Sequence, residues 1–403
     1  MSMLTKSWSD QLNRKDNLVP MLSIKPTNIL ILGGGFGGLA AANELRQNFS
    51  MDVKITIIDK KDYFMMGLVK LWILNGTREF EFSKKPLQSI TKKGIDFIND
   101  EIIKIDPKKK SVTTKSRELS YDYLIIALGV ELAPEQINGL CEHGLILYEI
   151  IDIPKIREAI KKIRSGKLAI SITGMPYKCP PAPYEAALLI HSMLNDLGTR
   201  NSVQIDFYSP APITLPAAGP QVSEELLQLL KSKNINFHGL HKTTSVEKNT
   251  LRFENSETNF DLLIAIPPHK VPTVIVDAGF AQRGKFISVD RTCKTNFENV
   301  YAIGDVNEIM VTDKIAVPKA GIFAEGEGIT VARNIISKIR QEQEKAIFDG
   351  KGGCFVEMGK RIAGYLEVDM FATPNPITLL KQPNEQNFKD KEKFEKDRLA
   401  KWL

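Results

Sequence analysis

Short apolar runs alternate with amphipathic stretches along most of the chain, and this alternation is typical of a doubly wound α/β protein. The runs that predict buried strands are 28–32, 53–58, 121–129, 167–172, 203–208 and 261–266. Shorter strands are predicted around 95–105 and 111–114, and helices from residue 39, from residue 186 and over about 320–339. The stretch 63–86 is interpreted as rich in loops. We therefore predict an α/β fold with two Rossmann-like dinucleotide-binding domains and a C-terminal region.

The order of these elements predicts the domain division. A second α/β unit begins near residue 145, and the segment Val300–Asp305 returns the chain to the first unit. The predicted parts are a flexible arm over 1–26, a first domain formed by 27–144 and 276–340, a second domain over 145–275, and the C-terminal region 341–403. The arm is polar and lacks the apolar core and cleavage site of a signal peptide.

A glycine-rich loop between the first strand and the first helix is typical of a dinucleotide site. Gly33, Gly35 and Gly38 stand where a tight turn, close approach of a pyrophosphate and helix–strand packing each exclude a side chain. The second strand ends at Asp59, 21 residues after Gly38, where a ribose-binding carboxylate is expected. Strand, loop, helix, strand and acid occur in the required order.

The corresponding loop of the second unit differs. The strand 167–172 enters Thr173–Glu185, which keeps one glycine and carries Cys179 close to the start of a helix. A helix N-terminus favours a thiolate, so we expect a reactive sulfur here, and the alternative is a buried cysteine in a proline-rich loop. The strand 203–208 ends in Ser209 without an acid for a second ribose.

Composition narrows the possible functions. A net charge of +6 over 403 residues is mild, and no nucleic-acid motif is present, so we expect no nucleic-acid partner. The charge is compatible with an anionic membrane surface, although no apolar run is long enough to span a bilayer. The four cysteines form no Cys-x-x-Cys pair, and the histidines show no metal-ligand spacing, so we expect no metal.

Several motifs together resemble a known family. The glycine loop, Ala127–Gly129 and Ala302–Asp305 resemble the FAD oxidoreductases that contain two dinucleotide-binding domains. Three further segments resemble sulfide:quinone oxidoreductase and the flavoprotein of flavocytochrome c sulfide dehydrogenase; they are Cys179–Glu185, Val317–Ala324 and Cys354–Met358. The resemblance runs from about residue 27 to the end of the chain.

The resemblance implies an FAD site. The residues that it places at the cofactor are Gly33, Gly35, Phe36, Gly38, Asp59, Ala127, Gly129, Gly304, Asp305 and Lys319. Asp305 would bind the ribityl chain, and Lys319 would stabilise the negative charge of the reduced flavin. Methionine occupies positions 65 and 66, where the flavocytochrome protein attaches its flavin through a cysteine, so we expect non-covalent FAD.

The resemblance also implies a redox pair made of Cys179 and Cys354, in which sulfide opens a disulfide and electrons pass through the flavin to a quinone. Cys141 is a candidate third redox cysteine, although no motif surrounds it, and Cys293 is interpreted as structural. Glu185 is expected near the pair, and stabilisation of the helix dipole by an acid at a helix start explains it equally well. His269 is either a proton shuttle or a solvated loop histidine, and the solvated interpretation is favoured.

The sequence therefore predicts an FAD-dependent enzyme that oxidises sulfide to sulfur or polysulfide and reduces a quinone. The alternatives are a type-II NADH:quinone dehydrogenase and an electron-transfer or sensor flavoprotein without turnover. We expect a cytoplasmic protein that can lie peripherally on the inner face of the cell membrane, and a homo-oligomer is left open. In the C-terminal region, the apolar face Phe388, Leu399, Trp402 and Leu403 either contacts lipid or packs on the protein's own core.

Overall fold

The computed structural model describes residues 27–403. Its first sheet has five parallel strands in the order β21–β9–β1–β2–β5. The predicted arm over 1–26 lies outside the described residues. The strands are β1 (Thr27–Leu32), β2 (Val53–Asp59), β5 (Asp96–Asn99), β9 (Tyr123–Ile126) and β21 (Val300–Ala302). Isoleucine and leucine side chains dominate these strands and are buried, as expected for a parallel sheet covered on both faces.

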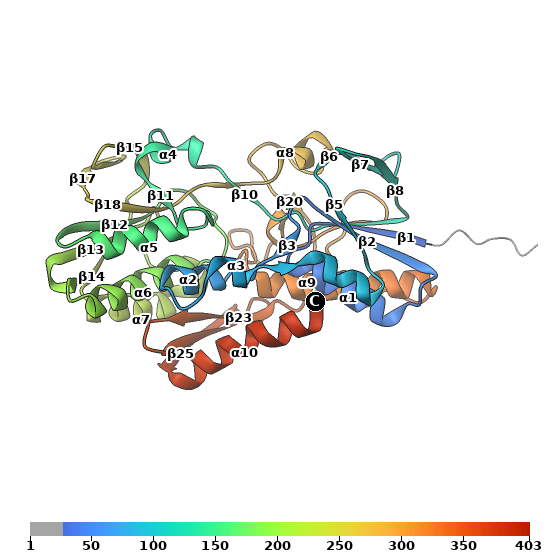
Figure 1. The fold of residues 1–403 in the computed structure, drawn as a ribbon. Helices are drawn as coiled ribbons and strands as arrows, with labels where there is room; N and C mark the ends of the chain where they lie inside the picture. The colour runs from blue at the N-terminus through green and yellow to red at the C-terminus, as the bar shows by residue number, and fades with distance from the viewer. Residues whose placement is uncertain (1–26) are drawn as a thin grey trace, which may run out of the picture.

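Two long helices pack against each other in this half of the molecule. α1 (Phe36–Asn48) directly follows the glycine loop, and α9 (Gly321–Ile339) follows the return of the chain through β21. Both helices lie below the first sheet in Figure 1. An antiparallel sheet, β6 (Ile102–Asp106), β7 (Ser111–Thr114) and β8 (Glu118–Ser120), lies at its outer edge.

A second five-stranded parallel sheet has the order β11–β18–β12–β13–β14. Its strands are β11 (Leu145–Ile146), β12 (Gly166–Ile172), β13 (Val203–Tyr208), β14 (Ile235–His238) and β18 (Leu262–Ile266). Its helices are α5 (Ile153–Lys162), α6 (Ala182–Asp196) and α7 (Gly219–Ser232), and an antiparallel sheet is formed by β15 (Thr243–Glu247), β16 (Thr250–Phe253) and β17 (Glu257–Asn259). The two parallel sheets occupy opposite sides of the molecule in Figure 1.

The two segments that connect the halves pair with each other. β10 (Glu131–Leu132) and β19 (His269–Lys270) form a short antiparallel ladder. The remaining short elements are β3 (Tyr63–Phe64), β4 (Lys85–Pro86), β20 (Ile287–Ser288), β22 (Asn307–Glu308), α2 (Val69–Leu74), α3 (Phe80–Ser83), α4 (Leu140–His143) and α8 (Thr273–Asp277).

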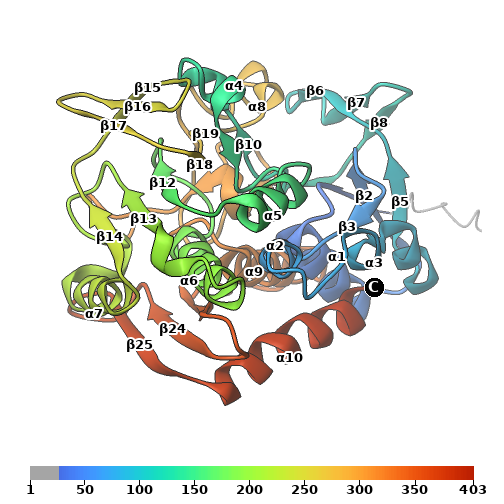
Figure 2. The same cartoon turned by 60° about the vertical axis from the view of Figure 1, so that its left-hand side comes forward.

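The C-terminal region forms an antiparallel sheet, β23 (Lys351–Glu357), β24 (Ala363–Asp369) and β25 (Ile377–Asn384), followed by α10 (Glu385–Trp402). Figure 2 shows α10 running from this sheet back toward α1. Phe388 and Trp402 are buried, and Leu399 and Leu403 pack against the core. Of the two interpretations of this apolar face, packing on the protein is therefore the one observed.

The predicted α/β class is confirmed, and the predicted strands and helices match with shifts of a few residues at their ends. The region 63–86, interpreted as rich in loops, also contains the short helices α2 and α3, which were not predicted. Val69, Trp72 and Leu74 of α2 are buried, so tertiary packing stabilises a helix that is too short to show a clear period. The domain boundaries at 144, 275 and 340 stay predictions.

Candidate active site

The loop from β1 to α1 has the geometry that a dinucleotide requires. A Cβ added to Gly33, whose φ is +109°, would lie 2.3 Å from the carbonyl oxygen of Ala127, and one added to Gly38 would lie 2.0 Å from the carbonyl oxygen of Gly33. Both glycines are therefore needed for close backbone packing. A Cβ on Gly35 would meet nothing within 4 Å, which leaves room for a pyrophosphate at this position. These residues fit a bound FAD.

Asp59 ends β2 beside this loop. Its carboxylate accepts hydrogen bonds from the backbone N–H groups of Gly34, at 2.7 Å, and of Lys61, at 2.8 Å. The acid is thereby fixed next to the glycine loop, which supports its predicted role at the adenosine ribose. Gly129 adopts φ +63° just after β9, consistent with the predicted break in the strand.

A second group of charged residues lies where β21 ends and α9 begins. Burial raises the pKa of Asp305, and Lys178 and Lys319 oppose this shift. Lys319 is 8% exposed, and its Nζ donates to the carbonyl oxygen of Asn307 at 2.8 Å. Burial lowers the Lys319 pKa to about 8 and raises that of Glu327 to about 8. Glu327 accepts hydrogen bonds from Gly304 N–H at 2.6 Å and from Asn307 Nδ2 at 2.7 Å.

Cys179 lies three residues before α6 in a left-handed backbone conformation, with φ 49°. A non-glycine residue in this region is strained, so its surroundings must hold it there. The Cys179 N–H donates to the carbonyl oxygen of Lys319 at 2.6 Å. The Tyr148 hydroxyl donates to the carbonyl oxygens of Lys178, at 2.7 Å, and of Cys179, at 3.3 Å. The first contact joins the loop that carries Cys179, residues 173–181 and here called the cysteine loop, to the segment that carries Lys319. The Tyr148 contacts hold the same loop at Lys178 and Cys179.

The structure brings Cys179 and Cys354 together. Cys354 lies in β23, and the side-chain hydrogen bond between the two sulfurs is the largest cause of a Cys179 pKa well above its usual value. Burial and the negative charges of Glu185 and Asp305 act in the same direction. The expectation that the start of α6 favours a Cys179 thiolate was therefore wrong, because the neighbouring thiol, burial and the nearby carboxylates all favour the protonated form. Both residues are present as thiols.

Further polar side chains surround the cysteine loop. Burial lowers the pKa of Lys178 and lowers that of Lys70 to about 7, and the two ammonium groups repel each other. The Lys70 Nζ donates to the carbonyl oxygen of Tyr148 at 2.5 Å. Burial also lowers the pKa of His269 to about 4, with a contribution from Lys178. His269 is half-buried against Tyr148, so the interpretation as a solvated loop histidine was wrong.

Comparison with known proteins identifies the group to which this architecture belongs. The pattern of the family described as "Pyridine nucleotide-disulphide oxidoreductase" matches residues 27–170 and 192–328, which is more than half of the chain. The chain belongs to this family. It is therefore an oxidoreductase, and the predictions of an enzyme and of FAD as its cofactor are confirmed.

Individual relatives refine the assignment within the pyridine nucleotide-disulphide oxidoreductases. The chain is 28% identical to the sulfide-quinone reductase of Aquifex aeolicus (strain VF5) over 382 residues, covering 88% of this chain and 86% of that protein. The X-ray structure of the sulfide:quinone oxidoreductase from the same hyperthermophilic species matches with a TM-score of 0.85 at 26% identity, covering 93% of this chain and 91% of that one. The predicted resemblance to sulfide:quinone oxidoreductases is confirmed.

The chain is also similar to proteins of the alternative function predicted above, the type II NADH:quinone oxidoreductases. A type II NADH:quinone oxidoreductase of Staphylococcus haemolyticus is 24% identical over 326 residues, covering 76% of this chain and 81% of that protein. In the second glycine loop of this chain, Gly174 packs closely against Pro268, because a Cβ added to it would lie 2.5 Å from the Cα of Pro268.

The other two cysteines, Cys141 and Cys293, do not belong to the Cys179–Cys354 pair. Cys141 is exposed in α4, which lies at the top of the molecule in Figure 1, whereas β23 lies near the bottom. Burial and the negative charges of Glu142 and Glu135 raise its pKa. Cys293 is fully buried in the core, in line with a structural role. Between residues 27 and 403, no group of three or more His, Cys, Asp or Glu side chains is arranged to hold a metal ion.

The sequence analysis did not identify three residues next to the cysteine loop: Tyr148, Lys178 and Lys391. Lys178 directly precedes Cys179 and could have been noticed from its position alone. No motif surrounds Tyr148 in the sequence. Lys391 stands in a lysine-rich helix, where an exposed lysine is the usual expectation.

Proposed function

We propose that this flavoprotein oxidises sulfide to sulfur or polysulfide and reduces a quinone, with Cys179 and Cys354 as its redox pair and FAD bound non-covalently. The observation that carries the proposal is the meeting of these two cysteines, 175 positions apart in the sequence, beside Lys319 and Asp305. The names of the Aquifex aeolicus relatives support the same substrate and acceptor.

The chemistry at the pair starts from its oxidised form. Hydrosulfide attacks one sulfur of the Cys179–Cys354 disulfide, the bond between the cysteines breaks, and a persulfide forms on one residue while the other becomes a thiolate. Each hydrosulfide loses two electrons and one proton in becoming zero-valent sulfur, which leaves as sulfur or polysulfide. Bound FAD, held by the glycine loop and Asp59, would supply the two-electron redox chemistry that links the cysteine pair to the quinone.

The residues around the cysteine pair favour these reaction steps through their charges and hydrogen bonds. Lys178 places an ammonium group near Cys179, where it stabilises negative charge on sulfur. Lys178 and Lys319 both act on Asp305, and Lys319 would stabilise the negative charge of a reduced cofactor. Tyr148 holds the strained loop through the carbonyl oxygens of Lys178 and Cys179, so the Cys179 sulfur keeps one orientation. His269 has a pKa of about 4 and would act as a neutral acceptor near neutral pH.

Two features of the second α/β unit argue against NADH as the electron donor. Thr173–Lys178 supplies a single glycine, and Pro268 packs directly against it. β13 is followed by Ser209, where an acid would be needed to bind the ribose of a nicotinamide nucleotide. A type-II NADH:quinone dehydrogenase therefore remains the weaker alternative. A flavoprotein without turnover would have no use for the cysteine pair.

A quinone as acceptor suggests contact with a membrane surface. No helix within residues 27–403 is long and apolar enough to cross a bilayer. Ile377 and Leu379 of β25 are each about half exposed, and we propose that they and the preceding loop contact lipid at the inner face of the cell membrane. The apolar face of α10 is not available for this purpose.

The test is sulfide-dependent quinone reduction by Cys179→Ser and Cys354→Ser. Each variant removes one sulfur of the pair, and serine forms neither a disulfide nor a persulfide. We expect a loss of several orders of magnitude with FAD content unchanged, as for other residues that act as a unit. Either variant keeping half of the wild-type rate would overturn the proposed role of the pair.

A further inference from the structure

Three charged side chains from distant parts of the chain meet in the core close to the cysteine pair. The Nζ of Lys391, in α10, lies 2.5 Å from Glu185 Oε1 in α6 and 2.7 Å from Glu357 Oε2 in β23. The exposed fractions are 1% for Lys391, 4% for Glu185 and 3% for Glu357. We call these three residues the buried triad.

The buried triad differs from a surface ion pair in its energetics. Buried charges are retained only when they are paired and hydrogen-bonded, and removing one partner leaves an uncompensated charge in the core. Glu357 is further fixed by Trp72, whose indole N–H donates to Glu357 Oε2 at 2.8 Å. Lys391 also lies over the Trp72 ring, 5.0 Å from its centroid. The Lys391 ammonium group is therefore surrounded by protein partners: the two carboxylates and the Trp72 ring.

Each carboxylate of the buried triad belongs to a segment that carries one cysteine. Glu185 follows Cys179 by six positions in the α6 segment, and its charge contributes to the raised Cys179 pKa. Glu357 follows Cys354 by three positions in β23. The two segments are therefore joined twice, once through the cysteine sulfurs and once through Lys391.

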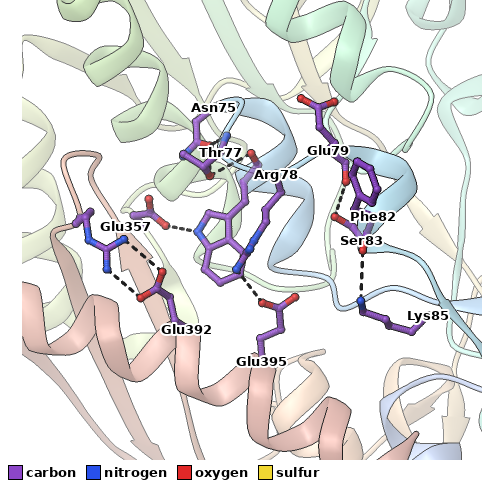
Figure 3. Close-up of polar contacts among 12 residues, drawn as sticks. Asn75, Thr77, Arg78, Glu79, Phe82, Ser83, Lys85, Glu357, Glu392 and Glu395 are labelled. Atoms are coloured by element: carbon purple, nitrogen blue, oxygen red, sulfur yellow. Dashed lines mark hydrogen bonds and ion pairs between the residues drawn. The ribbon is translucent and has the colours of Figure 1, made fainter.

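α10 holds Lys391 at a fixed position. On one side of it Glu392 pairs with Arg361, with an N–O distance of 3.0 Å, and Glu395 contacts Arg78 at 3.5 Å. Figure 3 shows Glu392 and Glu395 projecting from this helix toward their partners, with Glu357 beside them. At its end the helix is anchored by Trp402, which is fully buried.

We infer that Lys391 is a positioning residue: it holds α6 and β23 at the separation at which Cys179 and Cys354 can form their disulfide and form it again in each turnover. The inference rests on the proposed redox role of the pair. Without Lys391, two buried carboxylates face each other, and the segments that carry the cysteines move apart. Disulfide formation in a protein depends on how closely the two sulfurs are held, so a small separation lowers its equilibrium constant.

The experiment measures this constant in the holoenzyme, without sulfide or quinone. Wild-type and variant proteins are equilibrated anaerobically with glutathione and its disulfide, quenched with acid, alkylated and analysed by mass spectrometry. The two thiols lose two electrons and two protons, and one glutathione disulfide is reduced to two glutathiones. We expect Lys391→Met to lower the equilibrium constant for the Cys179–Cys354 disulfide at least tenfold. Lys393→Met, an exposed lysine two positions along α10, should match wild type.

A second variant separates positioning from folding. In Glu185→Gln/Glu357→Gln/Lys391→Met the triad is neutral, so no buried charge is left unpaired and the protein should fold even if Lys391→Met does not. This triple variant should still show a constant at least tenfold below wild type, because no lysine joins the segments. A constant within twofold of wild type in either folded variant would overturn the inference. Failure of sulfide to reduce the wild-type flavin, with a normal constant, would instead overturn the proposed function alone.

Discussion

Glu185→Gln offers a quantitative test of the buried environment next to Cys179. Burial raises the pKa of Glu185 from an ordinary value of 4.5 to about 7, while Lys391 opposes the shift and Glu357 reinforces it. Each pKa unit corresponds to about 1.4 kcal/mol, so the difference between folded and unfolded chains amounts to about 3 kcal/mol. The glutamine side chain has nearly the same shape but does not titrate.

The sign of the effect follows from proton binding. Below pH 4.5 the carboxyl group is protonated in both states and adds no pH dependence. As pH rises toward 7, the unfolded chain releases this proton while the folded protein keeps it, so the wild type loses stability relative to Glu185→Gln. Above about pH 7 the difference is constant.

The assay is urea unfolding at pH 5, 6, 7 and 8 with saturating FAD, so that cofactor loss does not differ between proteins. Between pH 5 and 8 the free energy of unfolding of the wild type should fall by about 2.5 kcal/mol more than that of Glu185→Gln. Glu224→Gln, at an exposed position of α7, is the matched control and should parallel the wild type. Parallel curves for wild type and Glu185→Gln, or a wild type that gains stability with pH, would refute the account of this site.

Three further predictions concern single side chains. Gly35→Ala should give folded but colourless protein, because its added methyl group meets no protein atom within 4 Å and occupies the space expected for the pyrophosphate; full flavin content, measured after acid or heat release, would contradict this placement. Cys293→Ser and Cys141→Ser should keep sulfide-dependent quinone reduction near wild type, and a large loss in Cys141→Ser would bring that exposed thiol into the relay. Tyr148→Phe removes the hydroxyl donor to the strained loop, and with about 1 kcal/mol for such a hydrogen bond the rate should fall about fivefold; an unchanged rate would show that the loop holds its shape without it.

The parts of the fold that were predicted from the sequence are those specified by local patterns. β1, the glycine loop and Asp59 form one contiguous unit, so their spacing is sufficient to identify them. The C-terminal sheet was not predicted, because β23 contains two glycines and its pairing with β24 and β25 is set by contacts rather than by a clean alternation. β14 is only four residues long and depends on β13 for its register.

In the candidate site too, local segments were predicted from the sequence, whereas properties that depend on tertiary contacts were not. Cys179, Cys354 and Lys319 were found because each stands in a recognisable segment. The elevated pKa of Cys179 was not predicted, because it arises from Cys354 and from burial, neither of which is visible in the local sequence. Lys391 is one of many lysines in α10, and only the packing of that helix against α6 and β23 makes it a buried cation.

The most direct test of the central claim is to mix the anaerobic, oxidised holoenzyme separately with sulfide and with NADH and to follow flavin absorbance. Sulfide should bleach the flavin within the mixing time of a routine assay, because the Cys179–Cys354 pair receives it. NADH should leave the absorbance unchanged, since the loop at 173–178 lacks the glycines that a second pyrophosphate requires. Fast, saturable bleaching by NADH, with none by sulfide, would contradict the account and identify the chain as an NADH dehydrogenase.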